Sequence, residues 1–269
     1  MINDMTTPLV SVVIATRNRS GEIVKALESV QAQDYPAIEI IVVNDASTDD
    51  TQVILEQKSN IILVHNIEQL RLQKSLNRGC KLAQGKYIAR LDDHDYWVDK
   101  QKLSKQVALL EANPHLGVIG TAITLGKRTI INPLSDGDIR RQLLFRCPFS
   151  HVTIVMRRDL FEKVGGYDES LLYSEDWDLW LKIGQFSELA NLSEITTIVK
   201  EEAGSLTDQF YISQWQQNQN MLRKYARLYP RRYSAFLYQM FVGMFFKVIK
   251  KDSRVHKLFI KIYNKFFCS

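Results

Sequence analysis

Residues 87–97 read YIARLDDHDYW, an apolar run that ends in three carboxylates and an imidazole at positions 92–95. Carboxylates held this close repel one another, so the cluster costs stability unless something neutralises it. A divalent cation does so, because carboxylate oxygens and imidazole nitrogens are among its ordinary ligands. The apolar run therefore predicts a buried strand, and the cluster predicts a metal site at the carboxyl end of that strand.

Three further apolar runs precede this one, with helical patterns between them. The runs cover residues 9–15, 38–43 and 61–64. The polar groups that follow them are Thr16-Arg17-Asn18, Asn44-Asp45 and His65-Asn66. This alternation predicts an α/β fold, with right-handed βαβ units around a mostly parallel sheet. Because ligands bind beyond the carboxyl ends of parallel strands, we expect these polar groups to converge on one cleft.

The second half of the chain mixes helical and strand patterns. We expect helices at residues 99–112, 138–145 and 174–186, strands at 116–124 and 152–156, a loop or hairpin at 127–137, and a tight turn at Gly165-Gly166. The division we predict is a catalytic domain over residues 1–205 and a helical extension over residues 206–269.

The bulk composition is that of a folded protein, with 269 residues, 45% of them hydrophobic and 24% charged. The three cysteines fit no metal-ligand spacing and no disulfide framework, which favours a reducing compartment. Residues 1–8 contain no apolar signal core. We therefore expect a cytoplasmic protein.

The charge is distributed unevenly. Residues 221–269 contain twelve Lys or Arg and one acidic residue, so this segment carries +11 and the rest of the chain carries −6. Residues 233–246 hold no charge but are too few to span a bilayer. Basic, aromatic, amphipathic helices favour peripheral binding at the inner face of the cytoplasmic membrane. The alternatives are packing on the catalytic domain or on a second copy in a homo-oligomer. The strong apolar stripe argues against a nucleic-acid partner.

Six segments, in order and at ordinary spacing, resemble the family 2 glycosyltransferases, an inverting group with the GT-A fold. They are residues 11–18, 41–49, 75–79, 85–92, 164–169 and 175–180. The resemblance covers roughly residues 8 to 200 and implies a nucleotide-diphosphate sugar donor, a UDP-sugar by our interpretation. It also implies the residues that bind this donor, namely Thr16, Asn18, Asp45, Arg71, Asn77, Arg78, Asp92 and Asp93.

The same resemblance implies a catalytic base at Asp176, which matches the family's acid at that position. A carboxylate near a helix start is a credible base for removing a proton from an acceptor hydroxyl, although such acids also serve as helix caps. On the acceptor side we expect His151, Glu175 and Trp180. Of these, His151 and Trp180 also fit the packing of an ordinary core.

The metal site departs from the family's D-x-D pattern, because the chain reads Asp92-Asp93-His94-Asp95. Residues two apart share a face of an extended segment, so two pairings are open. We favour Asp92 with His94; the alternative is Asp93 with Asp95. An imidazole ligand favours Mn²⁺ over Mg²⁺.

The function predicted from the sequence is transfer of one sugar per event to a hydroxyl of a glycan or lipid-linked acceptor in surface polysaccharide synthesis. The Gln-x-x-Arg-Trp motif of processive synthases is absent from the sequence. A nucleotidyltransferase is one alternative, but residues 16–21 do not form the Gly-rich loop that it needs. A non-catalytic peripheral-membrane or polysaccharide-binding protein on a degenerate scaffold is the other.

Overall fold

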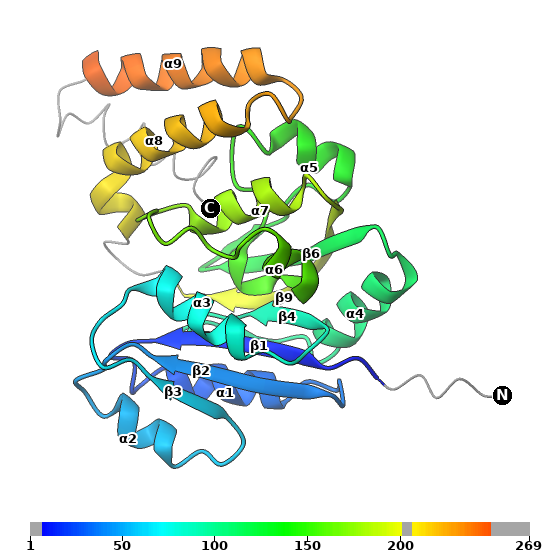
Figure 1. The fold of residues 1–269 in the computed structure, drawn as a ribbon, viewed down its shortest axis with the longest axis vertical. Helices are drawn as coiled ribbons and strands as arrows, with labels where there is room; N and C mark the ends of the chain where they lie inside the picture. The colour runs from blue at the N-terminus through cyan, green and yellow to red at the C-terminus, as the bar shows by residue number, and fades with distance from the viewer. Residues whose placement is uncertain (1–6, 201–205, 249–269) are drawn as a thin grey trace.

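The computed structural model describes residues 7–200 and 206–248, which form one mixed sheet with helices on both faces (Figure 1). Its strands are β1 (Val10–Thr16), β2 (Ile38–Asn44), β3 (Ile62–His65), β4 (Tyr87–Arg90), β5 (Tyr96–Trp97), β6 (Leu116–Leu125), β7 (Arg128–Ile130), β8 (Val155–Arg157) and β9 (Glu188–Val199). Its helices are α1 (Ile23–Gln31), α2 (Thr51–Glu56), α3 (Leu72–Leu82), α4 (Lys102–Ala112), α5 (Asp136–Gln142), the 3₁₀ turn η1 (His151–Thr153), α6 (Arg158–Lys163), α7 (Glu175–Ile183), α8 (Leu206–Tyr225) and α9 (Arg232–Val248).

The sheet has the strand order β3-β2-β1-β4-β8-β6-β9-β5, with β7 paired to β6. Strands β3, β2, β1 and β4 are parallel, β8 runs antiparallel between β4 and β6, and β9 is parallel to β6. Most of the strands in the described residues therefore run in one direction. The carboxyl ends of β1, β2 and β4 lie at one edge of the sheet, as the βαβ pattern predicts.

Alternate residues of the central strands fill two separate cores. In β1, Val13 and Ala15 pack with α3 and α7 on one face, while Val12 and Ile14 pack with α1 and α4 on the other. Helix α3 lies close against the sheet at Gly79, where an added Cβ would lie 2.7 Å from the Val13 side chain. Gly79 therefore sets the distance between this helix and the strands that carry the polar groups.

From residue 96 onward the structure departs from the sequence-based expectation in three elements and in several boundaries, among them that of α5, which spans Asp136–Gln142 rather than residues 138–145. Strand β5, helix α6 and the twelve-residue strand β9 were not predicted. Strand β8 begins at Val155 rather than at residue 152, because the Thr153 backbone amide donates a hydrogen bond to the Ser150 carbonyl at 2.9 Å and closes a 3₁₀ turn there, which the Thr153 hydroxyl reinforces with a second bond to the same carbonyl. The hairpin expected at residues 127–137 is present as β7 paired with β6.

Helices α8 and α9 stack over α7 on the side away from the sheet (Figure 1). Met221, Leu222 and Tyr225 of α8 share one core with Trp180 and Leu181 of α7. Ala235 of α9 joins the same core, so both helices pack on the body through described side chains, and the domain boundary at residue 205 stays a prediction. The helical pattern predicted near residues 255–266 lies outside the described residues. Within the described ranges, none of the helices combines the length and apolar character needed to cross a bilayer.

Candidate active site

A cavity of about 840 Å³ opens beyond the carboxyl ends of β1, β2 and β4 and is bounded by α3, α7 and α8. It collects ten of the residues predicted from the sequence: Thr16, Asp45, Arg71, Asp92, Asp93, His94, Asp95, His151, Glu175 and Asp176. The ends of β1, β2 and β4 therefore converge on one site, as the topology requires, whereas His65 and Asn66 after β3 were also expected there and do not line it.

The acidic cluster forms the floor of this cavity. One ligand atom from each of Asp92, His94 and Asp95 lies within 4.8 Å of the others. Asp93 is directed elsewhere and accepts from the Arg17 backbone amide at 3.4 Å. The Asp93 carboxylate also lies 2.9 Å from His94 Nδ1, a contact that fixes the imidazole ring. The favoured pair Asp92 and His94 therefore lies together, joined by Asp95 from the alternative pair.

A buried arginine lies behind the cluster. Arg90, at the end of β4, is almost fully buried and forms an ion pair with Asp92. Burial opposes ionisation of Asp92, but the Arg90 guanidinium outweighs this effect and holds the pKa of Asp92 below its ordinary value. Burial and then the Asp92 charge raise the pKa of Asp95 to about 7.

Burial alone would lower the pKa of His94, but the hydrogen bond to Asp93 and the surrounding carboxylates raise it to about 9. Arg90 and protonated His94 thus neutralise only part of the negative charge on the carboxylates of Asp92, Asp93 and Asp95. Two carboxylates and an imidazole, with the ring held from behind by Asp93, form a donor set that fits a divalent cation such as Mn²⁺.

The first turn of α7 lines the other side of the cavity. Asp176 Oδ1 accepts from the Trp177 amide at 2.7 Å, and the Cys147 thiol donates to Asp176 Oδ2 at 3.4 Å. The Gln73 side chain of α3 donates to Glu175 at 3.3 Å. Burial and then the Asp176 charge raise the pKa of Glu175 to about 7. Burial also raises the pKa of Asp176, so a proton acceptor of adjusted basicity lies here.

The β1 and β2 side of the cavity is tied to the loop before α3. Asp45 accepts from the backbone amides of Leu70 and Arg71, at 2.8 and 3.0 Å. Arg71 has φ 73° and ψ 169°, a region that is strained for any residue with a side chain. Thr16 is buried, and its hydroxyl has no hydrogen-bond partner within the described residues. An unpaired buried hydroxyl at a cavity wall is available to a ligand.

Three residues expected at the nucleotide do not line the cavity. Asn18 accepts from the Thr48 amide at 2.7 Å and joins the loops after β1 and β2. Arg78 donates to the His65 carbonyl at 2.8 Å. Asn77 exchanges hydrogen bonds of 2.9 Å with the backbone of Tyr167 and so holds the Gly165-Gly166 turn. The side chains of Asn18, Arg78 and Asn77 therefore hydrogen-bond backbone groups of the fold, and a local motif does not reveal which backbone groups need such partners.

His151 and Trp180, both expected on the acceptor side, lie in different environments. His151 lines the cavity, with Nε2 2.8 Å from the Tyr167 hydroxyl, and burial followed by the Arg90 charge lowers its pKa to about 3. Trp180 is 0% exposed and packs against Phe149, so it does not reach the cavity. The expectation that Trp180 faces an acceptor is corrected to the core packing that its pattern also fitted.

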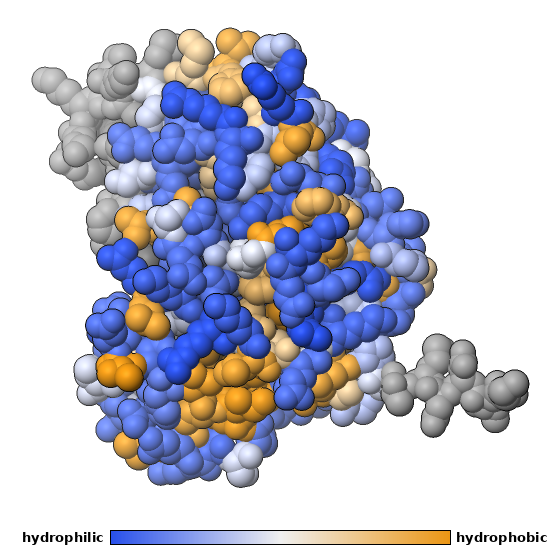
Figure 2. Space-filling view, viewed as in Figure 1, coloured by the Kyte–Doolittle hydropathy of each residue, from blue (hydrophilic) through white to orange (hydrophobic). Residues whose placement is uncertain are grey.

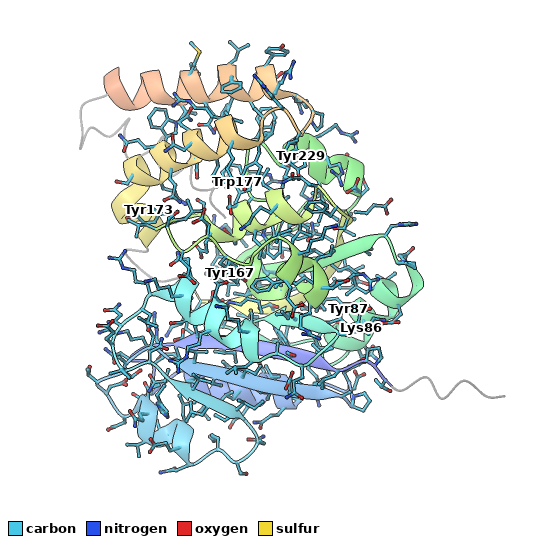
Figure 3. The ribbon with its side chains drawn as sticks, viewed as in Figure 1. Lys86, Tyr87, Tyr167, Tyr173, Trp177 and Tyr229 are labelled. Atoms are coloured by element: carbon cyan, nitrogen blue, oxygen red, sulfur yellow. The ribbon has the colours of Figure 1, made fainter. Side chains whose placement is uncertain are left out.

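Several cavity residues were not predicted from the sequence. They are Arg19, Gln73, Ser75, Cys147, Gln214 and Asn218, together with Arg90 directly behind the cavity floor. The sequence did contain an indication that Arg90 belongs to the site, because a basic residue that ends an apolar strand beside three acids is itself unusual. Gln214 and Asn218 had none, since they lie on a polar helix far along the chain. Tyr173 lies where the loop before α7 meets α8 (Figure 3).

The model of the family described as "Glycosyl transferase family 2" matches residues 11–165. An uncharacterised glycosyltransferase of Haemophilus influenzae is 32% identical over 70% of the chain, which spans 64% of that relative. The putative glycosyltransferase EpsE of Bacillus subtilis is 33% identical, over 73% of the chain and 74% of EpsE. A third relative, at 29% identity over 74% of the chain and 80% of its own length, is the Escherichia coli UDP-Glc:alpha-D-GlcNAc-diphosphoundecaprenol beta-1,3-glucosyltransferase WfaP.

Two solved structures share the fold. The S. aureus TarS 1–349 complex with UDP-GlcNAc superposes with a TM-score of 0.68 at 22% identity, over 81% of this chain and 65% of that one. The mannosyltransferase PcManGT from Pyrobaculum calidifontis, in complex with GDP-Man and Mn²⁺, gives 0.65 at 21% identity, over 88% and 70%. At these identities the likeness is one of fold, and the expected GT-A architecture is confirmed.

Proposed function

The chain belongs to glycosyl transferase family 2, and we propose that it moves one sugar per event from a UDP-sugar to a hydroxyl of a glycan or lipid-linked acceptor, with inversion at the anomeric carbon. The pathway we propose is surface polysaccharide synthesis. The WfaP name supports both the donor and the acceptor class, and the TarS complex supports a UDP-sugar. The GDP-Man complex of PcManGT makes GDP-sugars the natural comparison in any donor panel.

The proposal depends on one observation, that two chemically different groups of side chains face each other across one cavity. The cation-type cluster of Asp92, His94 and Asp95 forms its floor, and the carboxylates of Glu175 and Asp176 stand on α7. The two groups are close enough that the Asp92 charge contributes to raising the pKa of Asp176. Sugar transfer needs such a pair, because charge grows on the leaving diphosphate while the attacking hydroxyl loses a proton.

Each side of the cavity then has a chemical task. Asp92, His94 and Asp95 would hold a divalent cation, which neutralises charge on the diphosphate when bound. Thr16, with its unpaired hydroxyl, and Arg71 provide polar contacts for the nucleotide. Asp176 takes the proton of the acceptor hydroxyl, and its raised pKa makes it a better base near neutral pH. A base on the wall opposite the leaving group favours inversion, by the same geometry as in inverting hydrolases.

The experiment is release of nucleoside diphosphate from a panel of UDP- and GDP-sugars by the purified protein, with Mn²⁺, with Mg²⁺ and with a chelator. We expect release from a UDP-sugar, abolished by the chelator and faster with Mn²⁺. Equal or faster turnover with Mg²⁺ would argue against His94 as a ligand. No release from any donor, with or without acceptor, would instead support the non-catalytic alternative.

We also propose that α9 lies on an anionic membrane surface, at the inner face of the cytoplasmic membrane. Its exposed apolar residues are Tyr233, Leu237, Met240 and Phe241. They recur at helical spacing, and Figure 2 shows apolar residues beside hydrophilic ones along the edge where α9 lies. Arg231 and Arg232 at its start are exposed and add the charge that anionic lipids attract.

Sedimentation with phosphatidylglycerol-containing vesicles tests this placement. The variant L237D/F241D should lose most vesicle binding, because each aspartate puts a charge on the face that would enter the lipid. Leu134→Asp is a control for adding a charge to an exposed leucine, since Leu134 is 45% exposed and lies outside α9. Equal binding of both variants would contradict the placement.

A further inference from the structure

Helix α8 contributes directly to the cavity. Gln214, Gln217 and Asn218 are spaced three and four residues apart, so they share one face of the helix. Gln214 and Asn218 line the cavity and are 9% and 3% exposed. Buried amides are costly unless they are hydrogen-bonded, so their presence here requires partners, in the protein or in a ligand.

Part of that partnership is with the loop before α7. The Ser174 hydroxyl donates to Asn218 Oδ1 at 3.0 Å and accepts from Gln214 Nε2 at 3.4 Å. Gln217 accepts from the Leu172 amide at 3.1 Å and donates to the Tyr173 carbonyl. The loop that leads into the proposed base is therefore held from α8, more than forty residues away in the chain.

This arrangement places Ser174 in a strained backbone conformation. It adopts φ 56° and ψ 29°, the left-handed region that is unfavourable for a residue with a Cβ. It occupies the N-cap position of α7 but makes no side-chain capping bond, because its hydroxyl is directed to α8. Backbone strain of this kind persists only where the surroundings hold it, and here the α8 amides do so.

The side-chain oxygen of Asn218 accepts a hydrogen bond from Ser174, and the side-chain nitrogen makes no hydrogen bond within the described residues. The lining of this corner is Leu172, Tyr173, Ser174, Gln214 and Asn218, none of which is charged. Uncharged amides beside an aromatic ring and an aliphatic side chain suit a neutral sugar, with hydroxyls for the amides and a C–H face for the ring. The charged groups that would suit a diphosphate lie elsewhere in the cavity, at Arg19 and Arg71.

We propose that this corner, formed by residues 214–218 of α8 and residues 172–174, is the subsite for the acceptor sugar. Gln214 and Asn218 hydrogen-bond hydroxyls of the sugar that carries the attacking group, and the loop they hold sets that group beside Asp176. The amides thereby select the acceptor, while the donor is bound by the strand ends. This inference rests on the proposed transferase function.

The test is steady-state kinetics with the UDP-sugar that the wild-type protein consumes and, as acceptor probes, short-chain alkyl diphosphates each carrying one sugar. Gln214→Met and Asn218→Leu remove hydrogen-bonding atoms at similar volume. Each should raise the acceptor KM about tenfold or more, the effect of one lost hydrogen bond in a site built for hydroxyls, while the donor KM changes less than twofold. Gln216→Met, on the exposed face of the same helix, is the control and should change neither constant.

The outcomes separate the two claims. If the wild type transfers sugar and folded Gln214→Met has an unchanged acceptor KM, the subsite is contradicted. Gln214→Met keeps the Asn218–Ser174 hydrogen bond, so it still tests the proposal if Asn218→Leu fails to fold. Donor KM rising together with acceptor KM would also contradict it, since that indicates general loosening of the cavity. No transfer by the wild type to any probe, with no release of nucleoside diphosphate, contradicts the proposed function itself.

Discussion

The wall of the cavity formed by β1, β2 and β4 takes its polar groups from strand ends, whereas the opposite wall takes them from the first turn of α7 and from α8. On the strand wall, Asp92, His94 and Asp95 are neighbours in the chain. On the helix wall, Ser174 and Asn218 meet across 44 residues. Under the proposed function, local backbone geometry would set the donor side and the packing of C-terminal helices would set the acceptor side. The two walls are coupled through charge, since Asp92 contributes to raising the pKa of Asp176.

The largest effect that tests this comparison is expected at Asp176. Asp176→Asn should lower transfer about a thousandfold, because amide oxygen is too weak a base to take the acceptor proton. Donor affinity, set by the strand wall, should stay within a few-fold. The measurements are product formation and titration of the donor's nucleoside diphosphate.

Asp159→Asn is the matched control for that variant. Asp159 also stands in the first turn of a helix and accepts from the next backbone amide, Leu160, at 2.8 Å, but it lies outside the cavity. Near-normal transfer by Asp176→Asn, or an equal loss in Asp159→Asn, would remove Asp176 from its role.

The helix wall should also carry a cost in stability at high pH. The pKa of Glu175 is raised to about 7 by burial and the Asp176 charge, so the folded state holds its proton more tightly than the unfolded state does. Stability is therefore lost as pH rises from about 4.5 through 7. Glu175→Gln should raise the free energy of unfolding by about 1–2 kcal/mol at pH 8 and leave it nearly unchanged at pH 4. Denaturant titrations at both pH values measure this.

The same pH dependence in wild type and Glu175→Gln would show that the carboxylate pair does not strain the fold. Because the pKa of Asp95 on the strand wall is also raised to about 7, that result would leave this kind of cost to the strand wall alone.

The smallest effect is expected on the strand wall, at Arg71. Arg71→Gly should relieve a backbone conformation that only glycine adopts freely and raise the free energy of unfolding by about 1 kcal/mol. It should also raise the donor KM, since the guanidinium at the cavity is lost. Thermal unfolding and donor kinetics measure the two effects. A drop in stability would mean that the Arg71 side chain stabilises the fold more than its backbone strains it.

The strand wall was largely predictable from sequence. Apolar runs give the strands, their order gives a parallel arrangement, and polar residues at their ends then have to meet, as Thr16, Asp45 and Asp92 do. The helix wall was only partly predictable. Asp176 followed from a motif, but Asn218 lies on a helix whose pattern reports only that one face is polar.

Other misses have similar causes. Strand β9 contains polar residues such as Asn191 and Glu194 and pairs with β6 through several register shifts, so neither a continuous apolar run nor a clean alternation marks it. Asn77 was assigned to the nucleotide by resemblance, yet it bonds Tyr167, 90 residues away. Contacts of that range depend on the whole fold, and no local pattern encodes them.

The central claim is that one cation at the strand wall holds the donor's diphosphate, and an anomalous difference map of a crystal soaked with Mn²⁺ and UDP tests it most directly. We predict a single strong manganese peak between Asp92, His94 and Asp95, with the diphosphate density beside it. A manganese peak elsewhere, or diphosphate density away from residues 92–95, would contradict the account.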